Sequence, residues 1–290
     1  ADRDGAVTLH IPEEHFFPWS PDSPFLYDLT VGTTQGEEEQ RDTVHSYFAL
    51  RKWSCGPDAH GIMRFCLNGK PILLNGLLDQ GYWPEGLYTP PSDGAVVREL
   101  QTIKELGFNL LRKHAKIEPQ RWYYHCDKLG LIVWQDMVNG GGPYKLWFVT
   151  YLTNVFQPLL RRLPDARPLW GLLGRETEAG REEYARELEA TVKALQCHPC
   201  VGCWVPFNEG WGQFDAAGAV EAVRRLDDTR LVDEASGWYD QGRGDVDSLH
   251  NYFYPLRVRP RSRVVALSEY GGIAWPMPGH EPPRRAYGYG

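Results

Sequence analysis

Short runs of alternating apolar and polar residues, separated by turn residues, fill the first sixty positions. Residues 25–31 and 43–53 show this alternation and flank an acidic turn at residues 36–39. A period of two is typical of strands that bury one face. We therefore expect residues 1–62 to form part of an antiparallel β-sandwich.

From residue 66 the pattern changes to strands and helices in turn. Nearly continuous apolar runs, typical of strands buried on both faces, occur at residues 71–78, 108–111, 131–134, 201–207, 231–232 and 264–267. Segments with apolar residues at helical spacing lie between them, at residues 93–106, 118–129, 176–195 and 216–226. This order predicts an α/β fold with a parallel sheet, as a (β/α) barrel or a doubly wound sheet.

Polar residues gather where each predicted strand ends. They are Asp79, Arg112, His114, Gln135, Asp136, Asn208, Glu209, His250, Tyr252, Glu269 and Tyr270. In a barrel these ends form one mouth, where barrel enzymes keep their chemistry. A doubly wound sheet would carry a glycine-rich phosphate turn after its first strand, but residues 79–84 contain one glycine among bulky neighbours. We therefore predict a TIM barrel over residues 63–290.

The strand count suggests that this barrel is incomplete. With a further strand counted in the loop-rich segment that ends at His250, residues 264–267 form the seventh strand, and the sequence after Glu269 is rich in proline and glycine. We expect the barrel to stop before its eighth strand, with the first and seventh strands not paired directly. We also expect the chain to be a segment of a longer enzyme.

The amino-acid composition restricts the classes of binding partner that the protein could have. The 31 basic and 38 acidic residues give a net charge of −7, and no basic cluster alternates with aromatics, which argues against nucleic acid. The 11 Trp and 15 Tyr suit sugars, although they could equally fill a core. No stretch reaches the roughly 18 apolar residues of a membrane span, so we expect no membrane contact. The compartment stays open, with the cytoplasm slightly favoured.

Cys197, Cys200 and Cys203 are spaced three apart beside His198, which invites a metal interpretation. However, the segment continues directly into an apolar strand, in which alternate side chains point to opposite faces. We favour small buried hydrophobic residues over a metal site, and we expect neither a metal ion nor another cofactor.

Two carboxylates, Glu209 and Glu269, follow apolar strand runs and precede glycine or aromatic residues. Cleavage of a glycosidic bond needs one protonated and one ionised carboxyl group facing each other. Each glutamate could instead be a structural carboxylate with satisfied hydrogen bonds.

Residues 205–211 (VPFNEGW) and 268–272 (SEYGG) resemble the catalytic motifs of glycoside hydrolase family 2, the family of β-galactosidases, β-glucuronidases and β-mannosidases. Residues 67–76 and 109–114 resemble that family's first two barrel strands. Residues 19–27 resemble the entry to the immunoglobulin-like domain that precedes its barrel. The resemblance covers most of the chain. It implies that residues 1–62 are the C-terminal part of an immunoglobulin-like sandwich and residues 63–290 the catalytic barrel.

The resemblance also implies roles in a retaining β-glycosidase, with Glu209 as general acid/base and Glu269 as nucleophile. Asn208 would bind the sugar 2-hydroxyl, while Arg112 and Tyr252 would orient Glu269. The remaining candidates for substrate binding are Asp79, His114, Asp136, Trp211 and His250. We expect the two carboxyl groups to lie about 5 to 6 Å apart. We also expect apolar neighbours to raise the pKa of Glu209.

The sequence departs from the motifs of individual family members, so it does not decide which sugar the protein would recognise. Residues 79–83 and 135–139 lack the divalent-cation ligands of the well-known β-galactosidases. Trp134-Gln135-Asp136 is similar to a β-mannosidase signature, but residues 112–116 (RKHAK) replace the Arg-Trp-Gly-Gly-Gly segment of those enzymes. A carbohydrate is the expected partner, and the sequence is compatible with a homo-oligomer. The rival hypothesis is a carbohydrate-binding barrel that has lost hydrolysis.

Overall fold

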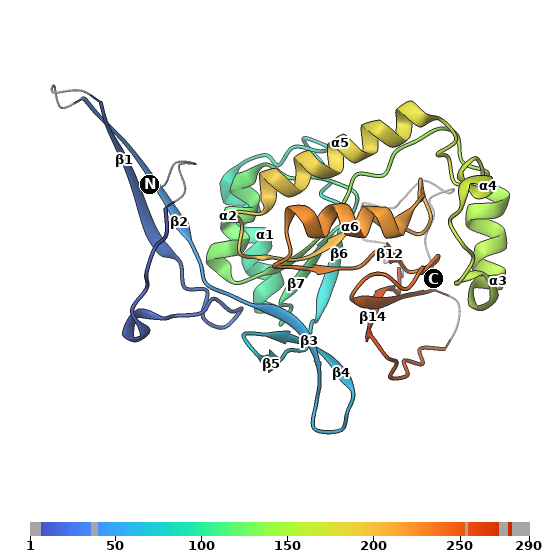
Figure 1. Cartoon of the computed structure of the whole chain (residues 1–290), viewed down its shortest axis with the longest axis horizontal. Coiled ribbons are helices and arrows are strands. Elements are labelled where there is room, and N and C mark those ends of the chain that lie inside the picture. Colours follow the sequence, from blue (N-terminus) through green and yellow to red (C-terminus); the bar gives the residue numbers. More distant parts are fainter. Residues whose placement is uncertain (1–6, 36–39, 253–254, 273–277, 280–290) are drawn as a thin grey trace.

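The computed structural model describes residues 7–35, 40–252, 255–272 and 278–279. Before the barrel, a 3₁₀ turn (η1, Glu13–His15) precedes an antiparallel ribbon of β1 (Tyr27–Gln35) and β2 (Gln40–Phe48). The ribbon projects from the body of the molecule (Figure 1).

A three-stranded antiparallel sheet joins the two expected domains. It contains β3 (Trp53–Pro57), β4 (Met63–Leu67) and β5 (Lys70–Pro71). β3 pairs with β4, so hydrogen bonds cross the expected boundary at residue 62. The division at that residue, and the immunoglobulin-like sandwich before it, stay predictions.

Over the described residues, nine parallel strand segments form the α/β barrel, and because β9 and β10, like β11 and β12, follow one another along the chain, they occupy seven strand positions. Five make one sheet in the order β11-β9-β8-β7-β6. Their bounds are β6 (Gly76–Asp79), β7 (Leu110–Lys113), β8 (Ile132–Asp136), β9 (Val201–Val205) and β11 (Leu231–Val232). Two separate parallel pairs complete the set: β10 (Phe207–Asn208) beside β12 (Ala235–Ser236), and β13 (Val246–Asn251) beside β14 (Val264–Tyr270). Every residue of β7, β8 and β9 is buried, as expected for parallel strands covered on both faces.

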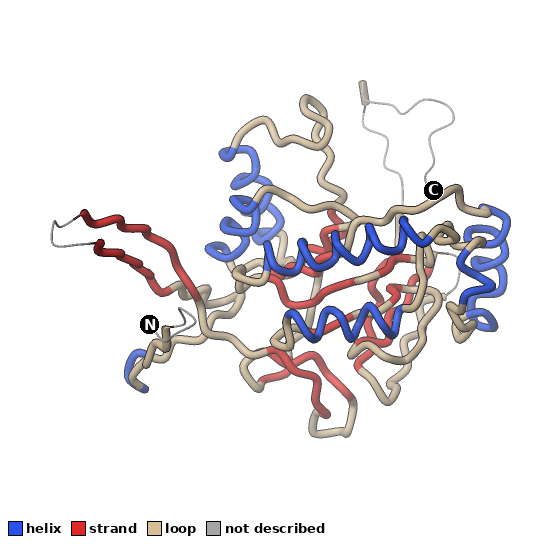
Figure 2. Tube along the Cα trace, turned by 45° about the horizontal axis from the view of Figure 1, so that its top comes forward, coloured by secondary structure: helices blue, strands red, loops and turns tan. Residues whose placement is uncertain are grey.

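Four helices match the predicted helical segments within a few residues. They are α1 (Asp93–Glu105), α2 (Gln120–Leu129), α5 (Glu178–Leu195) and α6 (Ala216–Leu226). Ser92 caps α1 as predicted, because its hydroxyl accepts a hydrogen bond from the Ala95 amide at 3.1 Å. Helices α5 and α6 run side by side over the sheet (Figures 1 and 2).

A long insertion separates β8 from α5. It contains a π-helical turn, η2 (Trp147–Leu152), then α3 (Thr153–Leu160) and α4 (Arg167–Trp170). The side chain of Gln157 donates a hydrogen bond to the carbonyl of His250 at 3.0 Å, which ties α3 to the end of β13. The insertion therefore lies at the carboxyl ends of the strands, beside the mouth of the barrel.

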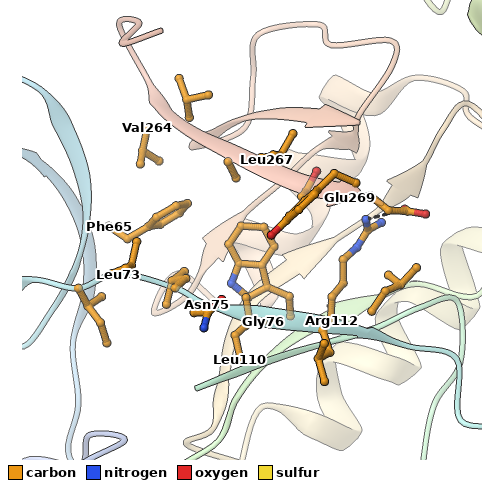
Figure 3. A pocket seen from close by; sticks show the side chains of 18 of the residues that line it. Phe65, Leu73, Asn75, Gly76, Leu110, Arg112, Val264, Leu267 and Glu269 are labelled. Carbon is orange, nitrogen blue, oxygen red and sulfur yellow. Dashed lines mark hydrogen bonds and ion pairs between the residues drawn. The ribbon is translucent and has the colours of Figure 1, made fainter. Parts of the chain in front are cut away.

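The first and seventh strands are not paired with each other over the described residues. β6 pairs with β7, and β14 pairs with β13. Between them lies a cavity of about 680 Å³ lined by residues of β4, β6 and β14, including Phe65, Gly76 and Val264 (Figure 3). That the barrel stops before its eighth strand, with these two strands unpaired, stays a prediction.

The first barrel strand is shorter than predicted from the apolar run at 71–78. Pro71 belongs to β5, which pairs antiparallel with β4, and β6 begins only at Gly76. Leu73, between the two, is 83% exposed. An apolar run alone did not separate the end of one sheet from the start of the next.

Candidate active site

Glu209 and Glu269 lie at the ends of barrel strands and face each other. Glu209 follows β10 in a left-handed conformation (φ 52°), and its amide donates to the carbonyl of Ser236 at 3.0 Å. Glu269 is in β14, in register with His250 of the neighbouring β13. One side-chain ligand atom from each of Glu209, His250 and Glu269 lies within 4.8 Å of the others.

Arg112 joins three strands beneath this pair. Its guanidinium binds both oxygens of Asp136 at 3.0 Å and donates to Asn208 Oδ1 at 2.6 Å and to Glu269 Oε2 at 3.3 Å. Figure 3 shows its bond to Glu269. Burial lowers the pKa of Arg112, but the charges of Asp136 and Glu269 outweigh burial and raise it. Arg112 is therefore a fixed cation that orients Asn208 and Glu269 together.

His250 is 2% exposed and contacts both glutamates. Its Nδ1 lies 2.8 Å from Glu209 Oε1 and 3.5 Å from Glu269 Oε2. Its Nε2 lies 3.1 Å from Arg112 Nη1. Because a guanidinium only donates, Nε2 must accept, and the proton of the neutral ring is therefore on Nδ1, directed at Glu209.

Glu209 accepts two hydrogen bonds on one oxygen. Besides His250, the hydroxyl of Tyr252 donates to Oε1 at 2.9 Å, and Trp211 Nε1 lies 3.4 Å from Oε2. Burial raises the pKa of Glu209, but the hydrogen bonds from His250, Tyr252 and Trp211 lower it below its usual value. The expectation of a raised pKa is therefore wrong for the sugar-free site, because it considered apolar neighbours and not donors.

Tyr252 was predicted to orient Glu269. Its hydroxyl hydrogen-bonds with both glutamates, and its pKa is raised by burial and by the two carboxylates. The phenol is therefore a neutral donor shared by the pair.

A cavity of about 790 Å³ opens at the mouth beside the two glutamates. The predicted site residues that line it are His114, Asn208, Glu209, Trp211, Tyr252 and Glu269. Sequence reasoning missed the lining residues Gln80, Asn139, Tyr144, Thr150, Asn154 and Trp238. Trp238 follows β12 closely, so the strand-end rule could have found it. Tyr144, Thr150 and Asn154 belong to the β8–α5 insertion, and the local pattern gives no sign that this insertion reaches the mouth.

Three predicted residues, Asp79, Asp136 and His250, lie behind the cavity wall. Asp79 Oδ2 accepts a hydrogen bond from Lys113 Nζ at 2.6 Å, and Asp136 forms an ion pair with Arg112. Neither lines the mouth cavity, and nor does His250. These three side chains therefore contact other site residues, whereas His114 reaches the cavity and bonds to the side-chain amide of Asn208 at 3.1 Å.

Within the described ranges, the group with metal-ligand composition is Glu209, His250 and Glu269. Cys200 and Cys203 are fully buried, and their thiols donate to the carbonyls of Tyr123 and Trp204, whereas Cys197 is exposed. The three cysteines do not converge. That the protein needs no metal or other cofactor stays a prediction. Over the same ranges, no helix combines the length and hydrophobicity that crossing a bilayer requires.

A barrel with two facing carboxylates at its mouth, held by an arginine, a histidine and a tyrosine, has the form of a glycoside hydrolase site. Residues 62–257 match the model of the glycosyl hydrolases family 2 TIM barrel domain. The chain belongs to this family.

Sequence similarity to curated proteins is consistent with this family assignment. The chain is 24% identical over 273 residues to a β-galactosidase of Klebsiella pneumoniae (strain 342), covering 91% of this chain and 22% of the relative. It is 28% identical over 240 residues to a β-galactosidase of Enterobacter cloacae, covering 83% of this chain and 20% of the relative. The chain thus spans about a fifth of the length of these curated relatives.

Solved structures share the fold. The β-D-glucuronidase structure of Dictyoglomus thermophilum superposes with a TM-score of 0.67 at 15% identity, over 90% of this chain and 45% of that one. The GH2 β-galacturonidase of Eisenbergiella tayi, bound to galacturonate, gives 0.65 at 16% identity, over 94% and 48%.

Proposed function

We propose that this chain carries the catalytic site of a retaining β-glycosidase, which removes terminal β-linked sugars through a covalent glycosyl-enzyme intermediate. The main support is the approach of the two carboxylates, because one oxygen of Glu209 lies within 4.8 Å of one oxygen of Glu269. Retaining enzymes place these groups about 5 to 5.5 Å apart, whereas inverting enzymes need about 6.5 to 9.5 Å to admit a water molecule.

In the first step, Glu269 attacks the anomeric carbon while Glu209 gives a proton to the leaving oxygen. The bond from carbon to the leaving oxygen breaks as the bond to Glu269 forms. Arg112 donates a hydrogen bond to Glu269 at 3.3 Å and so directs its oxygen. Asn208, whose side-chain oxygen is held by Arg112, is placed to donate its amide to the sugar 2-hydroxyl.

In the second step, Glu209 is ionised and takes a proton from water, which displaces Glu269 from the anomeric carbon. The donors His250 and Tyr252 stabilise the ionised form that this step needs. The first step needs Glu209 protonated, and a bound sugar that engages Tyr252 would remove one of those donors. Loss of that bond raises the pKa of Glu209 toward the value a general acid requires.

The test combines product stereochemistry with labelling of the nucleophile. Aryl β-glycosides of galactose, glucose, glucuronic acid, mannose and fucose identify a substrate, and NMR then follows the first-formed anomer. We expect the β-anomer first, and we expect a 2-fluoro sugar to label Glu269. An α-anomer, or a label on another residue, would overturn the retaining assignment.

The second candidate is a sugar-binding barrel without hydrolysis, and the open side between β6 and β14 favours it. Over the described residues, β6 pairs with β7 and β14 pairs with β13, and neither pairs along that side. A protein that binds the sugar in calorimetry but turns over none of the five aryl glycosides would support this alternative.

A further inference from the structure

We infer that the β8–α5 insertion builds a subsite for the leaving group, with Tyr144 and Trp211 as its aromatic wall, and that this subsite takes a sugar ring. The natural substrates would then be β-linked disaccharides or longer glycans. This inference rests on the proposed function, in which Glu209 protonates the leaving oxygen.

The position of the subsite follows from the chemistry of Glu209. The general acid must contact the oxygen that leaves, so the leaving group lies on the Glu209 side of the cleaved bond. Trp211 adjoins Glu209 there, with Nε1 at 3.4 Å from Oε2. The ring of Tyr144 meets Trp211 edge to face, with centroids 4.8 Å apart and planes at 82°. Both rings are half-buried and line the mouth cavity.

The insertion holds Tyr144 in place through close backbone contacts. Gly174, at φ 78°, packs against the tyrosine ring so tightly that a Cβ there would lie 2.8 Å from Tyr144 Cδ1. The Gly142 amide donates to the Gly174 carbonyl at 2.8 Å. The tyrosine is therefore pre-positioned, which reduces the entropy lost when a ligand stacks on it.

Arg175 connects the insertion to the loop that carries the general acid. Its Nε donates to the carbonyl of Gly212 at 2.8 Å, and its Nη1 donates to the carbonyl of Gly180 at 3.0 Å. Gly212 lies three residues after Glu209. The aromatic wall and the catalytic acid therefore share one scaffold.

The polar lining identifies the chemical class of the ligand. Asn139, Thr150 and Asn154 line the same cavity and come from the same stretch between β8 and α5. Amides and a hydroxyl bind sugar hydroxyls, while the rings accept the apolar faces of pyranoses. None of these five side chains carries a charge, which suits a neutral sugar better than an anionic or cationic leaving group.

The test compares substrates that share one glycon and differ in the leaving group: a methyl β-glycoside and a β-linked disaccharide. Stacking on one ring corresponds to about a 2- to 10-fold effect. Tyr144→Ala should therefore lower kcat/KM for the disaccharide by that factor relative to the methyl glycoside. Tyr144→Phe should retain the disaccharide preference. Hydrolysis of a preformed glycosyl-enzyme should be unchanged, because the leaving group has already departed.

The matched control is Tyr151→Ala, on the same insertion but 69% exposed and away from the cavity lining. Equal losses on both substrates in Tyr144→Ala, or no loss on either, would overturn the subsite. If the wild type hydrolyses no β-glycoside, the proposed function fails. Calorimetric titration with the disaccharide then tests whether the subsite exists. The subsite predicts that Tyr144→Ala binds the disaccharide more weakly than the wild type and Tyr151→Ala do.

Discussion

Arg112 Nη1 lies 3.1 Å from Nε2 of His250, and this contact determines the tautomer of a histidine that touches both candidate catalytic glutamates. Arg112 stays charged, so a second proton on His250 would place two donors opposite each other. Asp136, Glu209, Glu269, Asp233 and Tyr252 complete the ionisable groups around the pair. His250 therefore directs its Nδ1 hydrogen at Glu209, and its role is to position that carboxyl group and tune its acidity.

Removing this donor should move the pH dependence of catalysis. The hydrogen bond stabilises ionised Glu209, so His250→Leu should raise the pKa of Glu209. Because the general acid must be protonated, activity is lost as pH rises through that pKa, and the alkaline limb of kcat/KM should shift to higher pH. His250→Asn, which can still donate from its amide, should shift it less. An unchanged limb in a folded His250→Leu protein would contradict this role.

Glu209→Ala should be rescued by a small anion, whereas Glu269→Ala should not regain the normal pathway. Without the acid/base, an activated aryl glycoside still forms the glycosyl-enzyme, but water attacks it slowly because no base takes its proton. Azide needs no base and should accelerate turnover, giving a β-glycosyl azide detectable by mass spectrometry. Failure of azide to change the rate in Glu209→Ala would argue against this role.

Much of the site could be predicted because parallel strands place their carboxyl ends together. That rule brought Arg112, Asn208, Glu209, His250 and Glu269 into one list, and the structure brings them into contact. It could not distinguish side chains that face the cavity from those that support it. Asp79 meets the rule equally well, yet it turns to Lys113 because a buried amine needs a partner.

The residues that sequence reasoning missed depend on long-range packing. Tyr144 lies eight positions beyond the end of β8 and reaches the mouth only because the insertion folds back onto Gly212. The lowered pKa of Glu209 was equally hidden, since two of its donors come from β13 and the loop that follows it. Local periodicity specifies elements, but contacts between distant loops set the shape and acidity of the site.

Cys197 should react with iodoacetamide before the other cysteines. It is exposed, and its interaction with His198 lowers the pKa of its thiol. Burial raises the pKa of Cys55 to about 12, and Cys126, Cys200 and Cys203 are fully buried. His198 in turn lies 2.7 Å from Asp127, and its pKa is raised to about 9, so it stays protonated at neutral pH. Peptide mapping after brief labelling at pH 7 should find Cys197, and Cys197→Ser should abolish the fast phase. Faster modification of any other cysteine would contradict this prediction.

Lys113→Met should destabilise the fold far more than the same change at Lys193. Lys113 is 0% exposed, and its Nζ bonds to Asp79 at 2.6 Å and to Glu118 at 2.9 Å. Lys116 also binds Glu118, so the substitution leaves Asp79 as the carboxylate without its cation. Breaking a buried pair in this way costs roughly 3 to 5 kcal/mol. Lys193 pairs with Glu189 on the exposed face of α5, where water screens the charges and the loss should barely change stability. Urea unfolding of both variants measures the difference, and equal free energies of unfolding would show that Lys113 does not stabilise the strand ends beneath the mouth.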